Sequence, residues 1–296
     1  MAVSRKIIQR RIKSVRNTRK ITKAMELVAA AKMRRAATAV VKTRPYATLS
    51  WDTVKAIVAA TGEQVEHALL APHPEAKRTL LVLFASDRGL AGGYNVNILK
   101  LALQTIKALP AGSIDAITIG KRAGDAMART GVPMIASFTG LAEQPKFADI
   151  VPIGRLIIDE FTSGKYKNVL LGSTNYISAI TQKADVRQLL PLSIDEPSQS
   201  SALAANKTIT LSVTFEPNPS QVLDRVLPNL METLVYQALL EAAASEHASR
   251  MMAMRNATDS ATEMLDDLTF TYNQARQGAI TQEIAEISGG KAALEK

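Results

Sequence analysis

The segment that decides the fold is residues 227–278, LPNLMETLVYQALLEAAASEHASRMMAMRNATDSATEMLDDLTFTYNQARQG. Pro228 suits a first helical turn, and neither Gly nor Pro follows it until Gly278. A helix running from there to Ser288 would be on the order of 90 Å long, whereas a typical globular helix has about 11–12 residues. The segment therefore predicts a long helical shaft.

One narrow face of this predicted helix carries small and apolar residues at 3/4 spacing, a pattern that lets a second helix approach closely. Its members are Met254, Ala257, Ala261, Met264, Leu265, Leu268, Tyr272, Ala275 and Ala279. Further on the apolar face moves to Ile280, Ile284 and Ile287, while Gln282, Glu283 and Glu286 occupy the earlier seam. We expect the C-terminal tip to continue without its helical partner and to meet another partner that accepts apolar side chains.

A second long helix is predicted at the N-terminus, because residues 3–44 contain no Gly or Pro. It would be roughly 60 Å long before Pro45 and would continue past a bend toward residue 60. One broad arc of its surface is cationic, with Lys6, Arg10, Lys13, Arg16, Lys20 and Lys23. The apolar residues Ile8, Ile12, Val15, Ile21, Met25 and Val28 lie mostly off that arc and are interrupted at Thr18. This pattern predicts an imperfect packing seam and not a strict heptad.

The two terminal segments have opposite charge. Residues 1–44 hold fourteen Lys and Arg against one acid, a net charge of +13. Residues 220–296 hold six basic and eleven acidic side chains, a net charge of −5. Opposite charges favour an antiparallel helical pair, although each surface ion pair contributes little.

Residues 77–216 have the sequence pattern of an α/β domain. Strands are predicted at 79–86, 114–120, 132–138, 169–175 and 208–216, and most of them are separated by helical stretches. This alternation predicts a mostly parallel, Rossmann-like sheet, with a mobile polar connection at 193–206. The predicted fold is α+β or α/β: an antiparallel coiled coil of long N- and C-terminal helices plus a central α/β domain. The expected parts are 1–60, 77–216 and 217–296.

No constellation of catalytic or metal-binding residues stands out. The chain has no Cys, and its three His residues lack metal-ligand spacing. The loop DRGLAGGYN at 87–95 lies between a strand and a helix, where phosphate binds in many folds, but it matches neither G-x-G-x-x-G nor a P-loop. We interpret it as a structural turn, with a nucleotide site as the rival hypothesis. We expect no catalytic residue, cofactor or metal.

The cationic N-terminal helix permits two classes of partner. A +13 segment would attract phosphate, so a basic coiled-coil protein that binds nucleic acid is the alternative hypothesis. However, the segment contains no aromatic residue before Tyr46, and apolar residues interleave with its charges. A helix that lies against acidic protein surfaces is therefore favoured.

Nothing in the sequence predicts direct membrane insertion. No stretch reaches the ~18–20 apolar residues that cross a bilayer. The start, MAVSRKIIQRR, lacks the apolar region of a secretory signal, so we expect it to belong to the mature protein.

Four motifs, in order, resemble those of F-type ATP synthase gamma subunits of the bacterial type. They are ITKAMELVAAAKMRR at 21–35, SDRGLAGGYN at 86–95, YQALLEAAASEHASRMMAMRNATD at 236–259 and YNQARQGAITQEIAEI at 272–287. The resemblance covers essentially the whole chain. It departs from the family after Glu286, where Gly289 and Gly290 precede Lys291, and it lacks the cysteine pair of chloroplast relatives.

The resemblance implies a rotor that couples proton flow to ATP synthesis without a catalytic site of its own. Its partners would be the hexamer of alpha and beta subunits, the epsilon subunit and the ring of membrane c subunits, with no nucleic acid. Membrane contact would come only through these partners, at the cytoplasmic face of the bacterial inner membrane, where the chain would be peripheral.

The resemblance also implies contacts between rotor and stator. Lys23 and Met25 would face the lever region of the beta subunits, with Arg250 close on the opposite helix. Arg276, Gln277, Thr281 and Glu283 would lie at the upper contact with the catalytic subunits.

Overall fold

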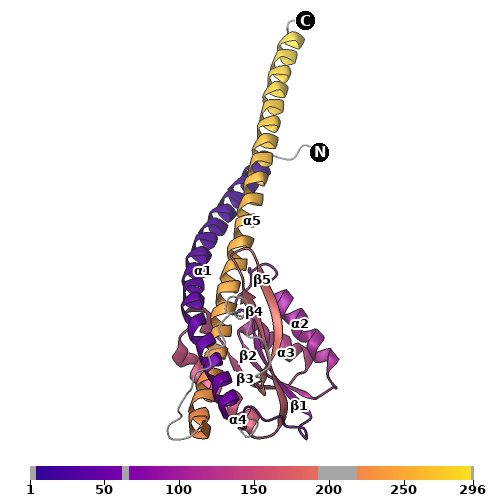
Figure 1. Ribbon diagram of the computed structural model, residues 1–296. Helices are drawn as coiled ribbons and strands as arrows, with labels where there is room; N and C mark the ends of the chain where they lie inside the picture. The colour runs from indigo at the N-terminus through magenta and orange to yellow at the C-terminus, as the bar shows by residue number, and fades with distance from the viewer. Residues whose placement is uncertain (1–4, 62–66, 193–218, 295–296) are drawn as a thin grey trace. The chain divides into compact units, whose positions relative to one another are not determined.

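The computed structural model describes residues 5–61, 67–192 and 219–294. The chain forms two compact units, one from residues 1–29 and 250–296 and the other from residues 30–249. Two long helices, α1 (Arg5–Thr61) and α5 (Pro219–Leu294), contribute residues to both units (Figure 1). The strand predicted at 208–216 and the connection at 193–206 lie outside the described residues. The three-part division into 1–60, 77–216 and 217–296 follows elements of secondary structure and stays a prediction.

The larger unit is built on a five-stranded sheet. Its strands are β1 (Arg78–Phe84), β2 (Ile114–Ile119), β3 (Met134–Phe138), β4 (Tyr166–Tyr176) and β5 (Gln182–Leu190). They follow the order β3-β2-β1-β4-β5, and every neighbouring pair is parallel except β4 and β5. The mostly parallel α/β sheet predicted from the sequence is thus confirmed.

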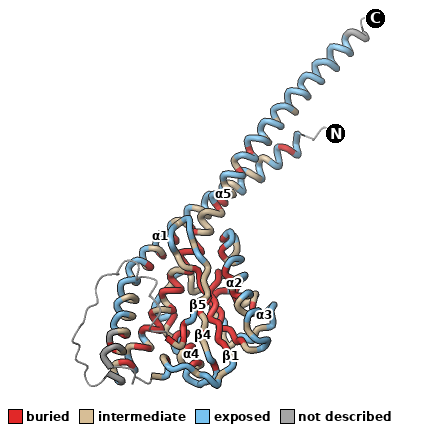
Figure 2. The backbone as a smooth tube through the Cα atoms, turned by 45° about the vertical axis from the view of Figure 1, so that its right-hand side comes forward, coloured by how far each residue is buried: buried red, intermediate tan, exposed pale blue. Residues whose placement is uncertain are grey.

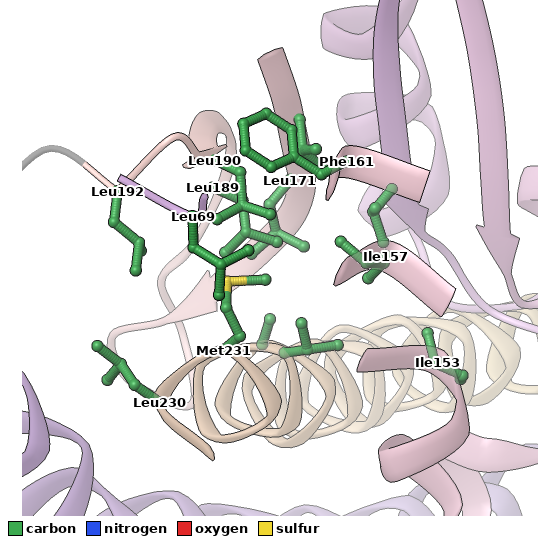
Figure 3. Close-up of a cluster of buried hydrophobic side chains, with 14 of the residues drawn as sticks. Leu69, Ile153, Ile157, Phe161, Leu171, Leu189, Leu190, Leu192, Leu230 and Met231 are labelled. Atoms are coloured by element: carbon green, nitrogen blue, oxygen red, sulfur yellow. The ribbon is translucent and has the colours of Figure 1, made fainter. Parts of the chain in front are cut away.

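Helices cover both faces of this sheet because alternate side chains of its central strands are apolar on each side. Leu81 and Leu83 of β1 pack with α2 (Tyr94–Ala108) and α3 (Lys121–Thr130). The opposite face packs with α4 (Phe147–Thr162) and with the first turns of α5. Figure 3 shows this second cluster, in which Phe161 and Met231 approach from the two helices.

Strand β5 was not predicted from the sequence. Its residues, QKADVRQLL, alternate between polar and apolar only over 183–187, and only Leu189 and Leu190 are fully buried. The strand lies at the edge of the sheet and pairs with β4 alone, while half-buried Ala184 and Val186 pack against the cluster on the α2 side of the sheet. A run of five alternating residues is a short periodic signal, and polar residues flank it on both sides.

Helix α1 has 57 residues and continues through Pro45 to Thr61, in agreement with the predicted continuation toward residue 60. Helix α5 has 76 residues and extends beyond the predicted start at Pro228, because it begins at Pro219. Pro228 therefore lies inside α5, and the prediction that it occupies the first turn is wrong. Leu227, Leu230 and Met231 around it are buried in the core of the larger unit, and this burial offsets the backbone hydrogen bond that proline cannot donate.

Candidate subunit-contact surface

The smaller unit is an antiparallel pair of helices. Gln9 Nε2 on α1 donates a hydrogen bond to the Tyr272 hydroxyl on α5 at 2.9 Å. Thirteen residues further along α1, Thr22 accepts a hydrogen bond from Thr258 at 2.8 Å. Because the residue numbers of the α5 partners decrease as those on α1 increase, the helices run in opposite directions, as predicted.

The buried seam of α1 follows a regular 3/4 spacing, contrary to the imperfect seam that we predicted. The residues on it are Ile8, Ile12, Val15, Arg19, Thr22, Glu26 and Ala29, all buried or half-buried. Ile21 and Val28, which we had assigned to the seam, are instead 61% and 57% exposed. The prediction failed because three polar residues, Arg19, Thr22 and Glu26, occupy seam positions between the apolar ones.

The facing seam of α5 agrees closely with its prediction. Met254, Ala261 and Leu265 are buried, and Ala257, Leu268, Tyr272, Ala275 and Ala279 are half-buried. Met264 is the exception and is exposed. It precedes Leu265 by one residue, which turns its side chain about 100° away from the seam.

The cationic arc of α1 is an exposed surface. All six residues assigned to it from the sequence, Lys6, Arg10, Lys13, Arg16, Lys20 and Lys23, are exposed. Lys23 lies 3.0 Å from the carboxylate of Glu26, whose side chain is mostly buried. The arc can therefore attract an acidic partner while the seam remains closed.

The end of α5 carries an exposed apolar stripe. Residues 280–291 are all exposed, and Figure 2 shows this stretch of the helix without a buried residue. Within it Ile280, Ile284 and Ile287 are 46%, 59% and 69% exposed and lie one turn apart on one side of the helix. Large apolar side chains exposed in a row mark a surface that is covered by a partner.

The structure brings the predicted contact residues into two groups. Arg276, Gln277, Thr281 and Glu283 are exposed and flank the isoleucine stripe. Lys23 is exposed and Met25 is half-buried on α1. The register set by Thr22 and Thr258 puts Met25 opposite about residue 255, so half-buried Arg250 lies a little over one turn earlier in α5.

The loop at 87–95 in the larger unit is held in place by the carboxylate of Asp87, its first residue. Asp87 Oδ1 accepts a hydrogen bond from the backbone N–H of Lys121 at 3.0 Å, and Oδ2 accepts one from Gly140 N–H at 2.9 Å. Lys121 is the first residue of α3, so Asp87 occupies the helix terminus to which a phosphate would bind. This geometry favours the structural turn over the nucleotide site.

The space beside this loop is too small for a nucleotide. The cavity there has a volume of about 10 Å³, roughly that of one water molecule, and is lined partly by Asp87, Leu239 and Glu246. Gly120 is required nearby because its φ is +96° and a Cβ atom would lie 2.0 Å from the Ala85 carbonyl oxygen. Residues of α5 thus fill the crevice in which doubly wound folds usually bind ligands.

At the other end of the sheet the buried carboxylate of Asp115 pairs with the partly exposed Arg78. The Asp115 carboxylate accepts hydrogen bonds from Arg78 and from the Tyr166 hydroxyl, the latter at 2.7 Å. Although burial favours the neutral acid, the bonds from Arg78 and Tyr166 lower the pKa of Asp115. Burial and the bond to Asp115 raise the pKa of Tyr166. Neither group changes protonation state near neutral pH, which is the behaviour of a structural pair.

Within the described ranges 5–61, 67–192 and 219–294 no three His, Asp or Glu side chains come together as a possible metal site. None of the helices there is apolar over a length that could cross a membrane.

The fold and the surface together define a class of protein: an α/β domain whose chain also forms an antiparallel pair of long helices with an exposed apolar end. The family model described as ATP synthase matches residues 4–294. The ATP synthase gamma chain of Herpetosiphon aurantiacus is 41% identical over the full length of both chains. The gamma chain of Stenotrophomonas maltophilia is 40% identical and covers 97% of this chain and 98% of the relative. The chain belongs to the family of ATP synthase gamma chains.

Solved structures agree with this assignment. A central stalk and c-ring structure of the Tetrahymena thermophila mitochondrial ATP synthase contains a chain 26% identical, with a TM-score of 0.60, covering 80% of this chain and 99% of that one. A chain from the Euglena gracilis mitochondrial ATP synthase has a TM-score of 0.67 over 98% of this chain and 94% of its own length. That chain is 20% identical and supports the fold alone.

Proposed function

We propose that this chain is the central rotor stalk of a proton-translocating ATP synthase. Rotation of a membrane ring of c subunits turns the chain inside a hexamer of alpha and beta subunits. The turning helices push each beta subunit in sequence through its nucleotide-binding states. The chain transmits conformational work and carries out no chemistry itself.

The observation that carries this proposal is the exposed end of α5. A helix of 76 residues whose last turns expose Ile280, Ile284 and Ile287 on one side is suited to a partner with an apolar surface that covers that side. The bore of a hexamer supplies such a surface. An isolated helix is also asymmetric about its axis, so it can act differently on otherwise identical subunits.

We assign the rotor-stator contacts to the two groups described above. Arg276, Gln277, Thr281 and Glu283 contact the catalytic subunits around the apolar stripe. Lys23, Met25 and Arg250 contact the lever region of the beta subunits, where the cationic arc of α1 meets acidic side chains. Exposure of Lys23 and of the four tip residues supports these assignments.

We assign the contacts with the other two partners, the epsilon subunit and the c ring, to the α/β unit. The absence of a catalytic site of its own is supported by Asp87, which occupies the α3 terminus, and by the cavity of about 10 Å³ beside it. The chain is peripheral at the cytoplasmic face of the bacterial inner membrane and touches the membrane only through its partners.

The experiment that tests this function mixes the chain with alpha and beta subunits from a related bacterium. We expect an active ATPase that contains one copy of the chain per hexamer. The tip variant Arg276→Ala/Thr281→Ala/Glu283→Gln should form the complex with reduced activity, whereas Arg129→Ala, at an exposed site on α3, should match wild type. If the chain failed to join the hexamer, the proposal would be wrong.

A further inference from the structure

A row of polar residues crosses the part of α5 that belongs to the larger unit. Gln237, Glu241, Ser245 and Ser249 recur every four residues, and we call them the polar stripe. Each step of four residues advances about 40° around a helix, so the stripe winds slowly around α5. It therefore faces α1 at its beginning and the β4–β5 hairpin at its end.

The first half of the polar stripe bonds to α1. The Thr43 hydroxyl donates to Gln237 Oε1 at 2.6 Å, and Gln237 Nε2 donates to Glu241 at 2.9 Å. Arg44 lies 3.5 Å from the same Glu241 oxygen and also donates to the backbone carbonyl of Tyr176 at 3.1 Å. Arg44 thus joins α1, α5 and β4 at one point.

The second half bonds to the hairpin. Ser245, fully buried, donates to the carbonyl oxygen of Thr174 in β4 at 3.2 Å. Ser249 donates to Gln182 Oε1 in β5 at 3.0 Å. Gln182 Nε2 in turn donates to the carbonyl oxygens of Ser178 and Ala179 in the hairpin turn, at 3.1 and 3.0 Å. The two serines therefore bond to the two strands of the hairpin, and Gln182 also holds the turn between those strands.

Between Gln237 and Ser249 the buried apolar surface of α5 consists mostly of small side chains. Five of its seven buried apolar residues are alanines, Ala238, Ala242, Ala243, Ala244 and Ala248, and the other two are Leu239 and Leu240. Alanine ridges are shallow, and apolar attraction has no preferred direction, so such packing resists rotation of the helix less than interlocking large side chains would. Hydrogen bonds do depend on direction, and they weaken steeply when their geometry is lost.

We propose that the polar stripe is a rotational lock that transmits torque between the α/β unit and α5. This inference rests on the proposed rotor function and assigns the torque-bearing contacts within the rotor itself. Gln237, Glu241, Ser245 and Ser249 are positioning residues: they touch no nucleotide and fix the angle of α5 against α1 and the hairpin. Without them α5 twists under load, and ATP is hydrolysed without full proton transport.

The test uses the complete ATP synthase, reconstituted with this chain in lipid vesicles, and measures protons pumped per ATP hydrolysed. The lock variant is Thr43→Val/Gln237→Leu/Ser245→Ala/Ser249→Ala, which removes both partners of the Thr43–Gln237 bond and leaves Glu241 paired with Arg44. We expect ATP hydrolysis near wild type and a pumping ratio lower by about twofold or more, because three directional bonds between elements are lost.

Thr233→Val is the matched control. Thr233 is also a buried residue of α5, but its hydroxyl donates to Asn229 O in the same helix. We expect it to leave the pumping ratio unchanged. If the lock variant does not assemble, Ser245→Ala/Ser249→Ala removes two of the bonds with little change of volume and is measured in the same way.

A cross-link distinguishes rotation of α5 against the α/β unit from a nonspecific loss of structure in the variant. The chain has no cysteine, so Thr43→Cys/Gln237→Cys, added to the two serine substitutions, provides its only two thiols. A short bifunctional maleimide that joins them should restore the pumping ratio. An assembled lock variant that pumps like wild type would overturn the inference, and so would a cross-linked variant that stays uncoupled. Failure of wild-type chain to assemble would instead contradict the proposed rotor function.

Discussion

Thr258 donates a hydrogen bond to the hydroxyl of Thr22 at 2.8 Å across the helical pair of the smaller unit. On α5 the seam neighbours of Thr258 are the buried residues Met254 and Ala261, whereas on α1 those of Thr22 are Arg19 and Glu26. A polar pair at a seam position fixes register, because sliding by one turn would break the bond and leave the Thr22 hydroxyl facing apolar side chains of α5.

The two threonines of this pair should be energetically coupled, so that replacing both costs less stability than the sum of the two single replacements. We expect Thr22→Val to lower the free energy of unfolding by about 1 kcal/mol, since Thr258 loses its bond across the seam and keeps only the one to the Met254 carbonyl oxygen. The double variant Thr22→Val/Thr258→Val should cost less than the sum of the single changes, with a coupling of about 0.5–1 kcal/mol. Urea unfolding followed by circular dichroism measures these values, and strict additivity would show that the bond has no energetic role.

Asp87 should contribute strongly to the stability of the larger unit. Its carboxylate accepts two backbone N–H bonds, and Asp87→Ala would leave the donors of Lys121 and Gly140 without it. We expect a loss of about 2–3 kcal/mol in the free energy of unfolding. Asp125→Ala, on the half-exposed side of α3, should change stability by no more than about 0.5 kcal/mol. Equal effects of the two changes would contradict the structural role of the loop.

His67 should make the larger unit less stable in acid. Burial lowers the pKa of His67, although Asp224 at 3.4 Å opposes this shift. Its Nδ1 accepts the Leu69 N–H at 3.1 Å and must be unprotonated to do so. The unfolded chain therefore binds the proton more readily, so stability is full above an unfolded pKa of about 6.5 and falls as pH drops through the folded pKa.

The measurement for His67 compares urea midpoints at pH 7.5 and pH 5 in wild type and in His67→Gln. The wild-type midpoint should fall more on acidification than that of the variant. A midpoint that falls equally in both proteins would assign the acid sensitivity to other groups.

The isoleucine stripe should matter in the complex and not in the isolated chain. Ile280→Ser/Ile284→Ser/Ile287→Ser should leave thermal unfolding of the free chain unchanged, because these side chains are exposed already. The same variant should lower the ATPase activity reconstituted with alpha and beta subunits. Leu265→Ser is the contrasting change: it buries a hydroxyl in the seam and should cost about 2–4 kcal/mol of stability.

The elements that could be predicted from the sequence are those with a periodic or uninterrupted residue pattern. The absence of Gly and Pro predicted both long helices, and the apolar runs around Leu81 and Val169 predicted central strands. The α5 seam was recoverable because its members are almost all apolar or small. Strand β5 was not predicted, since its alternating run covers only residues 183–187 and only its last two residues are fully buried.

Polar residues in buried positions account for most of the remaining errors. The regular spacing of the α1 seam was not recognised because three of its positions are polar: Arg19, Thr22 and Glu26. The polar stripe was missed for the same reason: the partners of Ser245 and Ser249 lie in a hairpin about seventy residues earlier in the chain. Such pairs require the fold before they can be recognised.

The most direct measurement of the central claim is rotation. A complex of this chain with alpha and beta subunits is fixed to a surface through the beta subunits, and a probe is attached to a cysteine placed at Arg129 on the α/β unit. On addition of ATP we predict rotation in one direction, with an equivalent stop for each beta subunit. A complex that hydrolyses ATP while the probe stays still would contradict the account.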